Sequence, residues 1–323
     1  MLPAEAPPRY AGRAMLPALA QALPVFAIIA LGFFAGRVKL IAGEQALALN
    51  RFVFLFAMPA AIFIFAATNE PPSVADLPFV GIYAAAVTAV FFIALAAGRR
   101  LHGLSRREAG GHAYATTLGN AVFLGLPIVL TIPEWGPHYL MLMLVEGILV
   151  IALGTAFLDR PEDGGASWRG VGQSLFRVVR NPLVLAMVLG FLVSLAGLRL
   201  PGPAESFFQL FGAAAGPTAL FALGVSLALA PAGAIRSATG RIAGISVLKL
   251  AVLPGLTFIG LYLVGAPREA IGAAMLFTVM PTAVTVFVQT SHARIYDRTV
   301  AAAITVTTLI SLVSVTAVLA VFN

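Results

Sequence analysis

The chain has 323 residues, of which 60% are hydrophobic and only 10% are charged, and its formal net charge is +7. A soluble globular domain carries about 25% charged residues, so this chain cannot cover itself with a hydrated surface, and the composition predicts an integral membrane protein. No segment alternates apolar and polar residues as an outer-membrane strand does, so we expect an all-α fold. The sequence has no Cys, which excludes disulfides and thiolate metal sites.

Ten segments are long and apolar enough to be membrane-spanning helices, which need about 20 mostly apolar residues each. They cover roughly residues 15–36, 47–68, 77–97, 109–132, 138–158, 181–198, 204–230, 240–264, 268–291 and 297–322. Most of the 20 basic residues fall in the connections after the odd-numbered spans. By the positive-inside rule these connections face the cytoplasm, which places both termini outside.

The longest connection, 159–180, divides the spans five and five. It predicts a cytoplasmic linker between a first five-helix repeat, 15–158, and a second repeat, 181–322. Because five is an odd number, the second repeat would be inverted in the membrane. Three matches support the repeat: residues 24–33 with 182–191, 59–63 with 217–221, and Pro127 with Pro281.

Polar and helix-breaking residues interrupt the fourth and ninth spans. Proline removes a backbone donor and clashes with the preceding turn, so we expect breaks or kinks at Pro127 and Pro281. Paired broken helices are typical of a secondary-transporter site near the bilayer midplane, and their N-termini favour an anion. The predicted binding residues of these two spans are Gly119, Asn120, Pro127, Met280, Pro281 and Thr282. The alternatives are an interhelical hydrogen bond for Asn120 and an ordinary membrane-helix kink for each proline.

Glu146 in the fifth span and Lys249 in the eighth are the two ionisable residues clearly at membrane depth. Burial of such groups is costly unless they are paired or hydrated, so we add both to the predicted substrate-binding residues. Glu146 could carry a proton or cation, and Lys249 could neutralise an anionic substrate. The alternatives are a structural ion pair, or a Lys249 side chain that snorkels to the cytoplasmic face.

The sequence predicts no metal centre and no bound cofactor, beyond a coupling proton or sodium ion. No His, Asp or Glu group has metal-ligand spacing. The short basic clusters between spans fit anionic lipid headgroups rather than nucleic acid. His112 and Gln289, near the cytoplasmic ends of the fourth and ninth spans, could line an access path or be ordinary interfacial residues.

The order of these features resembles the auxin efflux carrier family of bacterial and plant permeases. The matching motifs are Gly119-Asn120 with Phe123, Gly125 and Pro127, then Lys249 with Pro254, and Met280-Pro281-Thr282-Ala283. The resemblance covers nearly the whole chain. It implies a scaffold of spans one, two, six and seven, and a transport domain of the other six. The fourth and ninth spans would cross at Pro127 and Pro281 beside the substrate, and the transport domain would slide as an elevator.

Together these features predict a non-enzymatic carrier of a small organic anion in the bacterial inner membrane. The anion would be a carboxylate such as malonate, malate or an auxin-like indole acid. The first alternative is a sodium-coupled symporter of the bile-acid type, although its Glu and Gln-Asn sodium signature is missing from the ninth span. A membrane sensor and an intramembrane enzyme are further alternatives. A Gly- and Ala-rich scaffold helix is compatible with a homodimer.

Overall fold

The computed structural model describes residues 11–69, 71, 73–158, 180–229 and 238–322, with side chains from residue 23 onward. The predicted linker therefore lies outside the described residues, except for Arg180. The described part is helical, with one isolated antiparallel bridge between Gly119 and Thr282. Its helices are α1 (Ala11–Arg37), α2 (Gly43–Phe52), η1 (Val53–Ala57), α3 (Met58–Thr68), η2 (Val74–Asp76), α4 (Leu77–His102), α5 (Arg106–Thr117), η3 (Ala121–Gly125), α6 (Leu126–Val129), η4 (Pro133–Trp135), α7 (Gly136–Val145), η5 (Glu146–Val150), α8 (Ile151–Leu158), α10 (Pro182–Leu195), α11 (Gly202–Ala213), α12 (Ala215–Ala228), α14 (Thr239–Val247), η6 (Leu248–Val252), α15 (Leu253–Leu263), α16 (Arg268–Thr278), α17 (Val284–His292) and α18 (Asp297–Phe322).

Six continuous helical segments of the described chain are long and apolar enough to cross a membrane. They are Gly43–Thr68, Val74–His102, Pro133–Leu158, Gly202–Ala228, Thr239–Leu263 and Asp297–Phe322. Each overlaps one of the predicted spans. The other predicted spans differ: the first is α1, the sixth is the short helix α10, and the fourth and ninth are interrupted. An all-helical membrane protein is confirmed, whereas the count of ten spans stays a prediction.

Wide π turns precede three of the intramembrane prolines. Pro59, Pro127 and Pro254 each lie in the first turn of an α-helix that directly follows η1, η3 or η6. The residue before each proline donates its N–H five residues back: Met58 to Val53, Leu126 to Ala121, and Leu253 to Leu248. In a regular α-helix, a proline ring would clash with the carbonyl four residues before it. A π turn moves that carbonyl out of the i→i−4 hydrogen-bond pattern and so removes the clash. These prolines therefore stay inside continuous helical paths.

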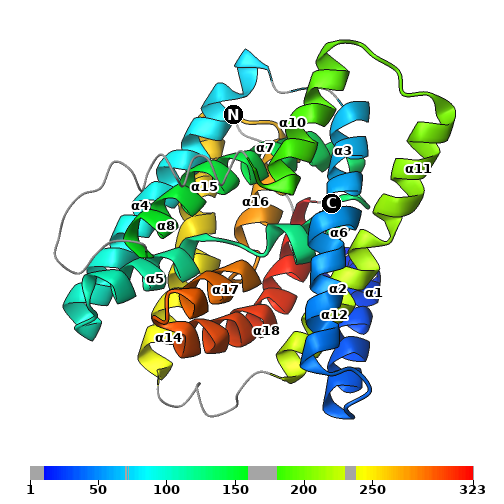
Figure 1. Cartoon of the computed structure of the whole chain (residues 1–323). Coiled ribbons are helices and arrows are strands. Elements are labelled where there is room, and N and C mark those ends of the chain that lie inside the picture. The colour runs from blue at the N-terminus through cyan, green and yellow to red at the C-terminus, as the bar shows by residue number, and fades with distance from the viewer. Residues whose placement is uncertain (1–10, 70, 72, 159–179, 230–237, 323) are drawn as a thin grey trace.

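Two close helix pairs depend on glycine. α1 packs along α12, and α10 packs along α3 (Figure 1). Gly32 of α1 faces the Phe221 carbonyl of α12, and Gly190 of α10 faces the Phe63 carbonyl of α3, with no room for a Cβ at either glycine. These two contacts join residues that the predicted repeat makes equivalent. They are consistent with inverted repeats, which remain a prediction.

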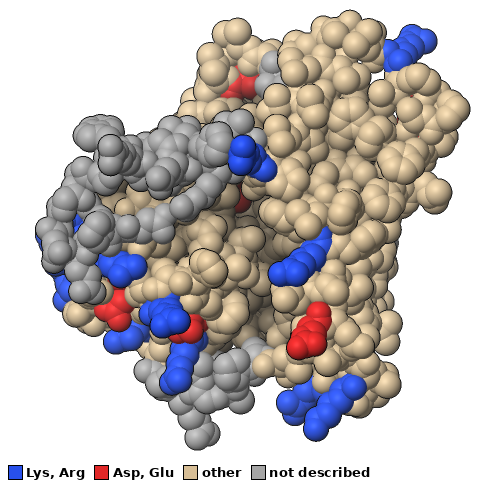
Figure 2. Space-filling model, in the orientation of Figure 1, with Lys and Arg blue, Asp and Glu red and all other residues tan. Residues whose placement is uncertain are grey.

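The surface has an apolar belt and a basic end. Large hydrophobic residues such as Leu31, Phe34 and Phe56 are at least half exposed on the outside of the helices. On the face shown in Figure 2, most Lys and Arg side chains gather in the lower half, toward the end where α1, α4 and α14 meet their connections. An exposed apolar surface of this extent suits lipid contact, and the basic side chains on this face lie mainly toward one end of the helices.

Candidate substrate site

Two interrupted helices meet backbone to backbone in the middle of the molecule. α5 ends at Thr117 and α16 ends at Thr278. A short non-helical segment follows each of them before the next helix begins. Asn120 N–H donates to the Pro281 carbonyl at 2.7 Å, and Ala283 N–H donates to the Leu118 carbonyl at 3.0 Å. Freed backbone groups at membrane depth must be satisfied within the protein, and here each broken segment satisfies the other.

The first break does not lie at Pro127, so that part of the sequence prediction was wrong. It lies at residues 118–120, and Pro127 follows later, in the first turn of α6. The π turn η3 accommodates this proline without breaking the helix. Pro127 faces Gly216 of α12, where a Cβ would lie 3.3 Å from the proline Cβ. The second break, at residues 279–283, does contain Pro281 as predicted.

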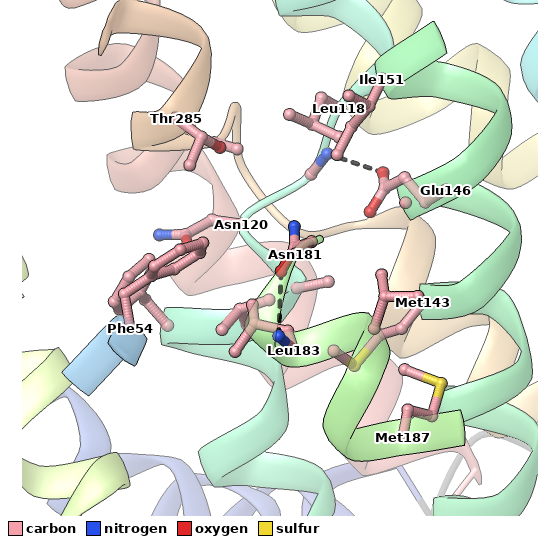
Figure 3. Close-up of a pocket in the computed structure, with 17 residues that line it drawn as sticks. Phe54, Leu118, Asn120, Met143, Glu146, Ile151, Asn181, Leu183, Met187 and Thr285 are labelled. Carbon is pink, nitrogen blue, oxygen red and sulfur yellow. Dashed lines mark hydrogen bonds between the residues drawn. The ribbon is translucent and has the colours of Figure 1, made fainter. Parts of the chain in front are cut away.

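A small cavity of about 80 Å³ lies beside the crossing (Figure 3). Of the predicted binding residues, Gly119, Asn120 and Glu146 line it. Pro127, Met280, Pro281, Thr282 and Lys249 do not. The remaining lining residues, mostly apolar, are Phe54, Leu118, Ala121, Val122, Phe123, Met143, Gly147, Ile151, Asn181, Leu183, Val184, Met187, Ala283 and Thr285.

Asn120 brings an unused hydrogen-bond donor to this cavity. Its side chain is only 2% exposed, and its Nδ2 has no hydrogen-bond partner among the described residues. A buried amide without a partner costs about 1–3 kcal/mol, so it calls for an explanation. We also considered an interhelical hydrogen bond for Asn120, and its Nδ2 forms none within the described residues. A bound polar ligand would satisfy it.

Glu146 and Lys249 hold the extended segment around Gly119. Glu146 Oε1 accepts the Gly119 N–H at 2.8 Å and lies 3.5 Å from the Tyr83 hydroxyl, which donates to it. Lys249 Nζ donates to the Thr117 carbonyl at 3.2 Å. A Cβ on Gly119 would lie 3.0 Å from Lys249 Nζ and 3.5 Å from Glu146 Oε1, so the two charges flank this glycine. Lys249 is fully buried, so the snorkelling alternative was wrong.

Met280 and Thr282 support the crossing from behind. Thr282 Oγ1 donates to the Ala115 carbonyl at 2.8 Å, and its N–H donates to Thr307 Oγ1 at 3.1 Å. Met280 is fully buried, and its Cβ would be 3.4 Å from a Cβ on Gly119. These contacts engage both the hydroxyl and the N–H of Thr282 within the protein. We therefore assign both residues to the support of the extended segments.

A larger cavity of about 750 Å³, which we call the vestibule, adjoins the small one. Phe54, Phe123 and Thr285 line both, so they form the boundary between them. The polar residues of the vestibule wall are Asn50, Arg51, Ser226, Thr285, Gln289 and Thr305. Gln289 lies in this wall, whereas its role in an access path, one of the two sequence alternatives, stays a prediction. His112 does not line it: it is fully buried, and its Nδ1 is 3.0 Å from the Tyr296 hydroxyl.

Several site residues were not predicted from the sequence. Phe54, Met143 and Met187 carry no polar signal in an apolar chain. Asn181 had a recognisable sequence signal, because Asn followed by Pro is a common start of a helix. No group of three or more metal-ligating side chains occurs among the described residues.

The fold defines a multi-pass membrane protein with a small cavity beside two interrupted helices. The family model "Membrane transport protein" matches residues 17–319, so the chain belongs to that transporter family. The predicted resemblance to the auxin efflux carriers is thereby confirmed.

Curated relatives carry similar names. "Putative malonate transporter" of Rhizobium meliloti is 27% identical over 92% of this chain and 93% of its own length. "Uncharacterized transporter YfdV" of Escherichia coli K12 is 26% identical over 89% of this chain and 92% of its own. "Lysosomal cholesterol signaling protein" of mouse is 26% identical over 68% of this chain but only 27% of its own. Membership of a transporter family points to a non-enzymatic protein.

Proposed function

We propose that this protein is a secondary carrier for a small organic anion, in which the substrate carboxylate binds at the crossing of the two interrupted helices. The observation that carries the proposal is the unpartnered amide of Asn120, which is 2% exposed and lines the cavity beside that crossing. A carboxylate supplies acceptor oxygens for such a donor, and a charge-assisted hydrogen bond is roughly twice as strong as a neutral one.

The size of the cavity favours a short carboxylate over an indole acid. One water requires about 10–15 Å³ of such volume, so about 80 Å³ holds roughly five to eight water-sized groups. Malonate has seven non-hydrogen atoms and matches this size. The relative named for malonate, similar over nearly its whole length, supports the same class.

The vestibule gives the proposed site a route to one side of the membrane. Arg51 lies in its wall, near the start of the second predicted span, at the end of that span that the positive-inside rule assigns to the cytoplasm. We propose that this conformation faces inward, in the inner membrane, with both termini outside. α1–α3 and α10–α12 would form the scaffold of two inverted five-helix repeats, and sliding of the other helices would expose the site to the opposite side.

Glu146 is the candidate for coupling to a proton. It is the one acidic residue in the wall of the small cavity, and it also fixes the Gly119 N–H of the crossing. A change in its charge would act directly on the segment that carries Asn120. Sodium coupling is the alternative, and a sodium gradient distinguishes the two.

Uptake of ¹⁴C-malonate into proteoliposomes tests the proposal. We expect saturable flux that unlabelled malonate and malate inhibit, and that a pH gradient rather than a sodium gradient stimulates. A folded, monodisperse sample without saturable flux of malonate, malate or an indole acid would overturn it. If the flux depends on a sodium gradient and not on a pH gradient, sodium is the coupling ion instead of the proton. The proposed substrate site would be unaffected.

A further inference from the structure

Asn181 offers a second amide to the same cavity, from the other half of the chain. It is the N-cap of α10, a helix of 14 residues, and its Oδ1 accepts the Leu183 N–H at 2.9 Å. The cap fixes the side chain, so the NH₂ group points away from the helix. Figure 3 shows its nitrogen on the side opposite Leu183. No hydrogen bond from this nitrogen is found within the described residues.

The helix end itself adds a positive potential. An α-helix carries the equivalent of roughly half a positive charge at its N-terminus, which favours an anion there. Pro182 has no N–H, and the Leu183 N–H is used by the cap. Neither of the first two backbone positions of this helix therefore offers a free N–H, and the Asn181 side chain supplies a donor in their place.

An independent observation points to the same place. Asn120 lines this cavity from the crossing, is 2% exposed, and has an Nδ2 without a partner among the described residues. Two amide nitrogens from different elements thus line one cavity of about 80 Å³. One buried amide without a partner can be a packing defect. The half-buried Asn181 adds a second amide donor at the N-terminus of α10, and the two together form a donor set suited to the two oxygens of a carboxylate.

We propose that Asn181 is a substrate-binding residue, which with Asn120 donates to the carboxylate of the transported anion. This inference rests on the proposed function and deepens it. It places one ligand on α10 and the other on the crossing, so that the substrate bridges two elements that are not continuous in the chain. Glu146 lies in the same wall, but its Oε1 is engaged by Gly119 and Tyr83, and Lys249 lies close behind it.

Two substitutions separate binding from capping, because Asp and Ser are N-cap residues about as good as Asn. Asn181→Ser retains the cap and removes the amide donor. Asn181→Asp retains the cap, removes the donor and adds a negative charge toward the anion. We expect all three proteins to melt at nearly the same temperature. The affinity for malonate should fall about tenfold or more in N181S, and malonate uptake should be lost in N181D.

The readouts are the concentration dependence of ¹⁴C-malonate uptake and the shift in melting temperature that malonate produces in detergent. Uptake and melting shift in both variants equal to those of the wild type would overturn the inference and leave the proposed function intact. If N181D does not fold, N181S alone decides, because an unchanged malonate affinity in it also overturns the inference. If the wild type shows no saturable carboxylate flux, the proposed function fails, and the inference fails with it.

Discussion

The backbone N–H of Asn120 lies 2.7 Å from the carbonyl oxygen of Pro281, to which it donates, and this bond joins the two interrupted helices. The backbone of Asn120 therefore holds the crossing, while its side chain faces the cavity. A substitution that keeps the backbone should separate the two tasks. The same division applies to its neighbours, since Thr282 and Lys249 bind protein carbonyls and Thr285 lines the cavity.

Asn120→Ala should abolish transport and leave the fold intact. The variant retains the N–H that donates to Pro281 and loses a side-chain amide whose Nδ2 has no partner in the described structure. Removal of such an amide should not lower the melting temperature. Loss of a hydrogen bond to a charged ligand costs about 1.5–3 kcal/mol, which corresponds to a roughly 10- to 150-fold weaker affinity. Malonate uptake measured beside thermal unfolding checks this, and a fully active variant would refute the site.

Two threonines close in sequence should respond in opposite ways to replacement by valine, which has nearly the same shape. Thr282→Val removes the bond to the Ala115 carbonyl and leaves a buried acceptor unpaired, so it should destabilise the protein by about 1–3 kcal/mol. Thr285→Val changes only the cavity wall. It should raise the KM for malonate while leaving the melting temperature unchanged. Each variant serves as the control for the other, and equal behaviour in both assays would contradict the assignment.

Glu146 and Lys249 should prove energetically coupled. Glu146→Gln retains an oxygen for the Gly119 N–H but removes the negative charge that lies with the buried Lys249 beside Gly119. Removal of one member of a buried charge pair typically costs about 3–5 kcal/mol, so the single variant should be strongly destabilised. Glu146→Gln combined with Lys249→Met removes both charges and should recover most of the stability.

The double variant also tests the coupling role of Glu146. If Glu146 carries the proton, this stable variant should show no stimulation of uptake by a pH gradient. If a pH gradient stimulates uptake by the double variant as it does in the wild type, both residues have only a structural role. Thermal unfolding of the two single variants and the double variant measures the interaction energy directly.

The sequence predicted the long spans well, because each needs only an apolar stretch of sufficient length. The segments Val74–His102 and Asp297–Phe322 contain the predicted spans 77–97 and 297–322. It placed the first break wrongly because proline is the visible helix breaker, whereas a π turn can accommodate it. Gly119, which lies between Lys249 and Glu146, marks the actual break. That environment is assembled from three distant parts of the chain and has no local signature.

Charge in the vestibule should assist the capture of an anion. Arg51 is exposed in the vestibule wall, so Arg51→Gln should raise the KM for malonate at low ionic strength. The increase should reach at most about fivefold, because one unit charge at about 4 Å in water contributes about 1 kcal/mol. The increase in KM should disappear in about 1 M salt, where the screening length is about 3 Å.

Arg199, also exposed, follows α10 and does not line the vestibule. Arg199→Gln should therefore leave the KM unchanged, and an equal effect would exclude a specific role for Arg51.

Stability should depend on the glycines that lie in close contacts between helices, and much less on glycines elsewhere. A Cβ at Gly190 would lie 2.6 Å from the Phe63 carbonyl oxygen, so Gly190→Ala should force α10 away from α3. Overpacking of this kind costs about 1–3 kcal/mol and should lower the melting temperature. A Cβ at Gly255 in α15 would meet no neighbouring atom within 4 Å, and Ala is the better helix former there. Gly255→Ala should therefore leave the melting temperature unchanged or raise it. Because α10 also carries Asn181, Gly190→Ala should weaken malonate binding as well, and a variant with wild-type stability and uptake would show that this helix pair is not tightly packed.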